Sequence, residues 1–228
     1  MFGRKNAEFF SFSGVFRRFF DKLLIVVRRR FDQSRIDSLA VLVEFTHTRS
    51  AYIAQTALYG YLKTRMGTRY REIFADPEFQ PSLNKAKWET FAACLSDLSV
   101  FVAATVYHHA ELTRDEAVAL SRYCLEESLS TTFGECDLDG LADQTLARFN
   151  ERLAWVNFEI VWDGEKAFTA SPDQLLASAP VIDEFKEYDG EIVRNSIRFK
   201  WRDIRERFRK RVDAQALAVA WRGIAANS

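Results

Sequence analysis

Apolar positions recur every three or four residues along most of the chain, which is the spacing of helices with one buried face. The first such segment covers residues 15–31, where Phe and aliphatic side chains face one way and Arg and Lys face the other. More apolar segments follow at about 36–66, where Gly67 can end the helix, and at about 82–109. The pattern therefore predicts several long helices.

Turn and capping residues divide the pattern further. Pro77 and Pro81 forbid a continuous helix between the second and third segments. The Thr-Arg-Asp-Glu run at 113–116 is a capping box, which opens a helix that extends to about residue 129. Residues 134–140 predict a polar loop before the next helix.

The helix predicted at 141–158 has an ambiguous end. Apolar residues alternate between 156 and 162, and Asp163 and Gly164 suit a hairpin turn. A helix that ends at Gly164 is favoured, because no other strand signal exists to pair with a hairpin. The hairpin remains the alternative.

Three more helices are expected in the C-terminal part. Ser171 suits an N-cap, and Pro172 suits the first helical position. The longest pattern runs over about 181–212. Asp213 can then cap a short final helix that extends to Trp221.

These elements predict an all-α fold. A single multi-helix bundle at 32–228, with a long C-terminal helix, follows a basic, Phe-rich amphipathic segment at 1–31. The 228 residues include 20 Phe, 9 Gly and 4 Pro, which favours long helices with aromatic cores. No apolar run approaches the roughly 20 residues of a membrane span. Charged residues interrupt the N-terminal apolar stretch, which argues against a signal peptide.

The cysteines indicate a reducing compartment. Cys94, Cys124 and Cys136 are an odd number without a Cys-x-x-Cys pair, which argues against a disulfide framework and a structural zinc site. We therefore predict a cytoplasmic protein, without a metal or another cofactor.

Charge is segregated along a chain that has no net charge. Residues 1–30 carry a net charge of +6 and residues 194–211 one of +7, which leaves −13 for residues 31–193. The segregation predicts either two basic surfaces for an anionic partner or basic ends that close on the acidic middle. The near-neutral pI of about 6.9 and the lack of a helix-turn-helix or RNA-binding signature disfavour nucleic acid.

Both basic segments place arginines beside an apolar seam, as helices at membrane interfaces do. Each basic residue near an anionic membrane contributes about 1 kcal/mol. An anionic membrane surface or a partner protein would suit both segments. The alternative is that the seams pack into the bundle itself, which is favoured for the C-terminal helix. The predicted contact residues are Phe16, Arg17, Arg18, Phe19, Phe20, Lys22, Arg28, Arg29, Arg194, Arg198, Trp201, Arg202, Arg205 and Arg209.

One polar cluster interrupts an apolar helical segment. Glu44 and His47 have the Glu-x-x-His spacing of di-metal bundles, but such bundles need two of these motifs, and the second is missing. With Arg49 and His108, these residues are the candidates for hydrolase or metal-dependent catalysis. A buried polar network is the favoured alternative.

Several stretches carry a resemblance to known proteins. They are Glu-Phe-Thr-His-Thr-Arg-Ser and Leu-Tyr-Gly-Tyr-Leu-Lys-Thr-Arg-Met-Gly-Thr-Arg-Tyr within 38–70, Val-Ile-Asp-Glu-Phe-Lys at 181–186 and Asn-Ser-Ile-Arg-Phe-Lys-Trp-Arg at 195–202. In these stretches the chain resembles a family of uncharacterised all-helical alphaproteobacterial proteins, over most of its length after residue 30. The resemblance implies a bacterial helical protein, and some relatives carry an esterase label. No residue constellation in this sequence supports that activity.

The sequence favours a non-enzymatic role. We expect a peripheral membrane-associated or protein-binding helical adaptor or assembly factor, in the cytoplasm or at the inner face of the membrane. The alternative is an esterase-like hydrolase or a metal-dependent enzyme with a site around Glu44, His47 and Arg49.

Overall fold

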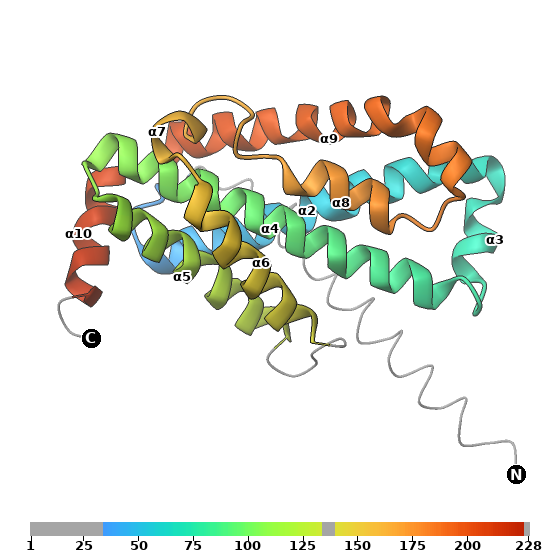
Figure 1. Cartoon of the computed structure of the whole chain (residues 1–228), viewed down its shortest axis with the longest axis horizontal. Helices are drawn as coiled ribbons and strands as arrows, with labels where there is room; N and C mark the ends of the chain where they lie inside the picture. The colour runs from blue at the N-terminus through green and yellow to red at the C-terminus, as the bar shows by residue number, and fades with distance from the viewer. Residues whose placement is uncertain (1–33, 134–139, 226–228) are drawn as a thin grey trace, which may run out of the picture. The chain divides into compact units, whose positions relative to one another are not determined.

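The computed structural model describes residues 34–133 and 140–225, and these residues form helices with no sheet (Figure 1). From Arg35 onward they belong to one compact unit. The predicted all-α bundle is therefore confirmed for the described part of the chain. The helix predicted at 15–31 and most of the loop predicted at 134–140 lie outside the described residues.

The central helix is α4 (Gln80–Ala110), which is covered on nearly all sides. Among the described residues it is the helix whose length and apolar composition would suit a membrane span, and its apolar stretch is packed inside the bundle. Its neighbours in space are α2 (Leu39–Met66), α5 (Arg114–Phe133), α6 (Leu141–Trp155), α7 (Phe158–Val161), α8 (Ala170–Ser178) and α10 (Ala214–Ala225).

The connection between α2 and α4 follows the sequence signals. α2 ends at Met66, and the next residue, Gly67, has a φ of 57° that is accessible to glycine without a steric penalty. A 3₁₀ turn (Gly67–Arg69) and α3 (Tyr70–Ala75) then lead to α4. Pro81 lies in the first turn of α4, where its missing N–H group has no helical partner to lose.

Two predicted helix caps are confirmed. In the capping box of α5, Glu116 N donates to Thr113 Oγ1 at 3.2 Å, and Thr113 N donates to Glu116 Oε2 at 2.7 Å. At the start of α10, Asp213 Oδ1 accepts a hydrogen bond from Ala216 N at 3.2 Å. Each cap satisfies N–H groups that have no partner within the helix.

Neither prediction for the region after α6 is correct. α6 ends at Trp155, and the separate short helix α7 begins at Phe158. Asn157 starts α7, because its side-chain oxygen accepts a hydrogen bond from Glu159 N at 3.0 Å. The helix therefore does not continue to Gly164, and the described residues form no hairpin.

Ile36 lies outside the helix in which the sequence places it. Its backbone forms an isolated parallel bridge, in which Ile36 N donates to Arg211 O at 2.8 Å and Asp213 N donates to Ile36 O at 2.9 Å. The Ile36 side chain is fully buried. The bridge ties the start of the compact unit to the junction between α9 (Asp183–Arg211) and α10.

α9 is the predicted long C-terminal helix, and it begins and ends within two residues of the predicted bounds. It packs against α8 and α2 along one side of the bundle (Figure 1). Near its N-terminal end, Asp189 is buried and accepts two hydrogen bonds from the guanidinium group of Arg65 in α2. The same guanidinium group lies over the ring of Phe185, 5.0 Å from its centre.

Candidate functional site

The inner face of α9 packs into the bundle. The apolar seam predicted from the sequence supplies this face, and Ile197, Trp201, Ile204 and Phe208 are all buried. Trp201 has no exposed surface, and its ring stacks on Phe168 with 4.6 Å between ring centres. Burial of each such side chain contributes about 1.5–3 kcal/mol. The alternative that this seam packs within the bundle is therefore the one that the structure supports.

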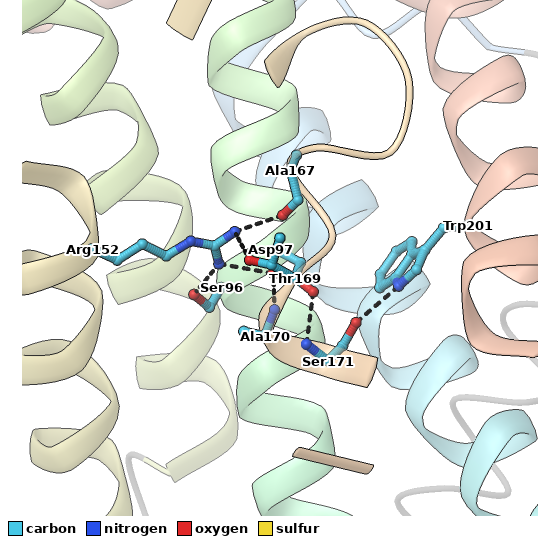
Figure 2. A network of polar contacts seen from close by, with 8 residues as sticks. All are labelled: Ser96, Asp97, Arg152, Ala167, Thr169, Ala170, Ser171 and Trp201. Carbon is cyan, nitrogen blue, oxygen red and sulfur yellow. Dashed lines mark hydrogen bonds and ion pairs between the residues drawn. The ribbon is translucent and has the colours of Figure 1, made fainter. Parts of the chain in front are cut away.

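Trp201 belongs to a buried polar network that joins α4, α6, α8 and α9 (Figure 2). Its indole Nε1 donates to Ser171 Oγ at 3.0 Å. The centre of the network is Asp97, whose Oδ1 accepts from Arg152 Nη1 at 2.8 Å and from Ala170 N at 3.0 Å. Its Oδ2 accepts from Ser171 N at 2.8 Å.

The network stabilises the fold because a buried carboxylate needs compensation. Asp97 is fully buried, so an unpaired charge there would cost several kcal/mol. Arg152 compensates it and also donates to Ser96 Oγ at 2.9 Å and to Ala167 O at 2.6 Å. The oxygens of Asp97 and the guanidinium of Arg152 are thus engaged in holding helices together, which indicates a structural role.

The sequence predicts that the side chain of Ser171 caps α8, but it does not. The helix begins at Ala170, two residues before the predicted first position, and the carboxylate of Asp97 accepts the N–H groups of Ala170 and Ser171. The Ser171 hydroxyl is left to accept from Trp201. Sequence reasoning missed this role of Asp97, although a single charged residue in the long apolar stretch of α4 was a signal for it.

Three of the predicted contact arginines pair with acidic residues of the bundle. Their partners lie in α8 or in the segment after α7, within the acidic middle of the sequence: Arg194 Nε lies 2.7 Å from Asp173 Oδ1, Arg205 Nη2 lies 3.6 Å from Glu165 Oε1, and Arg209 Nη2 lies 3.0 Å from Asp163 Oδ1. Partly exposed pairs of this kind contribute about 0–1 kcal/mol each. At these three positions the basic C-terminal segment closes on the acidic middle, which is one of the two arrangements that the charge segregation predicts.

The remaining predicted contact residues have different places. Trp201 is buried, so its prediction as a contact residue is wrong for the folded bundle. Arg202 is exposed and lies over the ring of Phe199, 4.4 Å from the ring centre. Arg198 is partly exposed and donates to Asn195 Oδ1 at 3.4 Å. The predicted contact residues between Phe16 and Arg29 lie outside the described residues.

The outer face of α9 carries a second apolar row that the sequence prediction did not include. Phe185, Tyr188, Ile192 and Phe199 are 41%, 76%, 71% and 64% exposed. They follow each other at steps of three, four and seven residues, so they form one line along the helix. Large exposed apolar groups in a continuous row mark interaction sites. We call this row the α9 outer stripe.

Charge along the outer stripe changes sign from one end to the other. In the N-terminal half of α9, Glu184, Glu187 and Glu191 are exposed. In the C-terminal half, Arg202 and Lys210 are exposed and Arg198 and Lys200 are partly exposed, together with the exposed acids Asp203 and Glu206. The outward surface of α9 is therefore acidic in its N-terminal half and carries a surplus of basic groups in its C-terminal half.

The fold places the residues of the polar cluster on α2 in different surroundings, some buried and one exposed. His47 is buried, its Nε2 lies 2.9 Å from Thr132 Oγ1, and its ring contacts Phe91 edge to face. Burial lowers the pKa of His47 to about 4, against an opposing effect of Glu44. Glu44 itself is exposed, whereas Arg49 is buried, and burial followed by nearby basic residues lowers its pKa. A general base works best with a pKa near the working pH, so His47 is poorly suited to that role.

The structure does not bring His108 to the other candidates. His47 contacts Phe91, and His108 lies about 25 Å farther along α4 by the rise of a helix. His108 is exposed and stacks on Trp162, with 3.8 Å between ring centres. In the described part of the chain, no three His, Cys, Asp or Glu side chains gather as they would around a metal ion. A single site from Glu44, His47 and His108 therefore does not form.

The two described cysteines are reduced and buried. Burial raises the pKa of Cys124 to about 12 and raises that of Cys94 as well. Because the thiolate is the reactive form, both behave as small apolar side chains of the core.

Comparisons with known proteins find no match. No protein-family model, curated protein or solved structure matches the chain.

Proposed function

We propose that this protein is a non-enzymatic helical adaptor that binds a partner protein through the outer stripe of α9. The observation that carries the proposal is the exposure of Tyr188, Ile192 and Phe199 in one line on a helix whose other face is fully packed. Folding does not explain these side chains, since they gain little burial from it. A partner helix laid along the stripe would bury them.

The charges favour a protein over a membrane as the partner of this stripe. An anionic membrane would attract the basic half of the helix, but it would repel Glu184, Glu187 and Glu191 at the other end. A protein surface can present both signs of charge, and complementary charges would fix its orientation on the helix.

Contacts along α9 hold the helix to the rest of the bundle and keep the outer stripe rigid. Asp189 is held by Arg65 near one end, Trp201 by Ser171 in the middle, and the Ile36 bridge lies at the other end. A rigid helix loses little conformational freedom when a partner binds, and this favours affinity.

Site-specific photocross-linking tests the proposal. Benzoylphenylalanine replaces Ile192 or Phe199 in the full chain, and Arg148, exposed on α6, is replaced in the control. We expect irradiation of the cells that make the protein to give a defined protein adduct from positions 192 and 199 and none from position 148. An equal adduct pattern at all three positions, or no adduct at any, would contradict the proposal.

An anionic membrane is the alternative partner, and it rests on the basic, Phe-rich pattern of residues 1–31. Co-sedimentation of the full chain with neutral and anionic liposomes, at low and high salt, tests it. A full chain with Phe16→Ser, Phe19→Ser and Phe20→Ser is the variant. Salt-sensitive binding to anionic liposomes that this variant loses would favour the membrane, whereas no binding by the unmodified chain would remove it.

A further inference from the structure

We infer that the partner on the α9 outer stripe is a second copy of this chain, packed antiparallel about a two-fold axis. The inference rests on the proposed function and names the partner of the same surface. A two-fold contact requires that one patch complement itself. The outer stripe meets this requirement in both charge and apolar character.

Charge is self-complementary only in the antiparallel direction. Asp189, Arg194, Arg205 and Arg209 are paired within the bundle and are left out of the comparison. Of the other charged residues, the N-terminal half exposes four acids and partly exposes one lysine: Asp183, Glu184, Glu187, Glu191 and Lys186. The C-terminal half exposes or partly exposes more basic than acidic residues: Arg198, Lys200, Arg202, Arg207 and Lys210, against Asp203 and Glu206. In an antiparallel pair, the acidic half of each helix lies beside the basic half of the other. In a parallel pair, acid would face acid and base would face base, which is destabilising. The charge pattern therefore selects the antiparallel orientation.

The apolar row overlaps itself in the same arrangement. Tyr188 and Phe199 are separated by about 16 Å along the helix, and Ile192 lies between them. An axis near residues 193–194 places Tyr188 of each copy against Phe199 of the other, with Ile192 close to the axis. Arg202 of one copy then approaches Phe185 of the other, in a cation–aromatic contact like the one it already makes with Phe199.

The size of the surface sets the strength of the expected association. A contact limited to one helix from each copy is smaller than a standard protein interface, so the dimer should form weakly and depend on concentration. Tyr188 and Phe199, which would pair on either side of the axis, are the groups expected to dominate the stability of the dimer.

Sedimentation equilibrium of the full chain tests the inference, over chain concentrations from about 5 to about 300 micromolar. Two variants reverse one half of the charge pattern each. Variant A is Glu187→Lys with Glu191→Lys, and variant B is Arg198→Glu with Arg202→Glu. None of these four residues takes part in an ion pair with another element in the described part of the chain, and circular dichroism checks that both variants fold.

We expect the average mass of the unmodified chain to rise with concentration from 26.4 kDa towards twice that value. Variants A and B should each associate with themselves at least about tenfold more weakly, because both contacts in the dimer become repulsive. An equimolar mixture of A and B should recover the association, since each basic half then meets an acidic half. Recovery by mixing is an outcome that a folding defect would not produce.

Two results would overturn the inference. One is an unmodified chain that stays at the monomer mass over the whole range. The other is a dimer that survives in A and B alone, which would place the contact elsewhere. The proposed function fails separately, when photocross-linking at positions 192 and 199 gives no adduct. A monomeric chain that still cross-links there to a different protein would retain the adaptor proposal and remove the second copy.

Discussion

The inner and outer faces of α9 carry large aromatic residues two positions apart, but only one of them contributes to the fold. Trp201 is fully buried, stacks on Phe168 and donates to Ser171. Phe199 points away from the bundle, and Arg202 is the residue that lies over its ring. The inner face is thus explained by burial and hydrogen bonding, whereas the outer face is the surface that the proposed partner would cover.

The largest expected effect lies beneath the inner face. Asp97→Ala leaves the partly buried Arg152 without its carboxylate and removes the acceptor for two N–H groups of α8. We expect the free energy of unfolding to fall by about 3–5 kcal/mol, measured by urea denaturation. The control is Asp173→Ala, which removes an exposed partner of Arg194 and should cost less than about 1 kcal/mol. Equal losses in the two variants would contradict the structural role of Asp97.

A matched pair of aromatic substitutions tests the two faces directly. Trp201→Ala creates a cavity in the core and should lower the free energy of unfolding by about 3–5 kcal/mol. Phe199→Ala removes an exposed ring and should change it by less than about 0.5 kcal/mol. Urea denaturation at low chain concentration gives both values. A Phe199→Ala variant as unstable as Trp201→Ala would show that the outer face supports the fold.

The same contrast between buried and exposed residues applies to histidine, as a smaller effect that depends on pH. Burial lowers the pKa of His47 from 6.5 to about 4, so the folded state favours the neutral ring. The stabilising contribution is complete above pH 6.5 and is lost as the pH falls through 6.5 towards 4, by at most about 3 kcal/mol. We expect His47→Gln to flatten this part of the stability profile and His108→Gln, at an exposed position, to leave it unchanged. Parallel profiles for the unmodified chain and His47→Gln would refute the assignment.

Much of the helical fold could be predicted, because its signals are local. The spacing of apolar residues gave the long helices, and Thr113, Glu116 and Asp213 gave two caps. The errors occurred where a distant residue or a single polar residue decided the structure. Ile36 pairs with the α9–α10 junction, far away in the sequence, and Asn157 divides the expected helix with one cap.

The candidate site was harder to predict because one helix carries two apolar rows. The sequence predicts Trp201 as a contact residue while it favours packing of the seam into the bundle, and the whole seam is buried. The row with Ile192 begins in the acidic half of α9, outside the basic segment where a contact was sought. Which row faces inward depends on partners such as Ser171 and Phe168, and no spacing within α9 identifies them.

The most direct measurement is to weaken the outer stripe without touching the inner face. In the full chain, Ile192→Ser with Phe199→Ser removes the two apolar groups that the dimer would bury near its centre. The account predicts a free energy of unfolding within about 0.5 kcal/mol of the unmodified chain at low concentration, and no rise of mass in sedimentation equilibrium at high concentration. A marked loss of stability, or a mass that rises as it does for the unmodified chain, would contradict the claim that the outer face of α9 is a contact surface and not part of the fold.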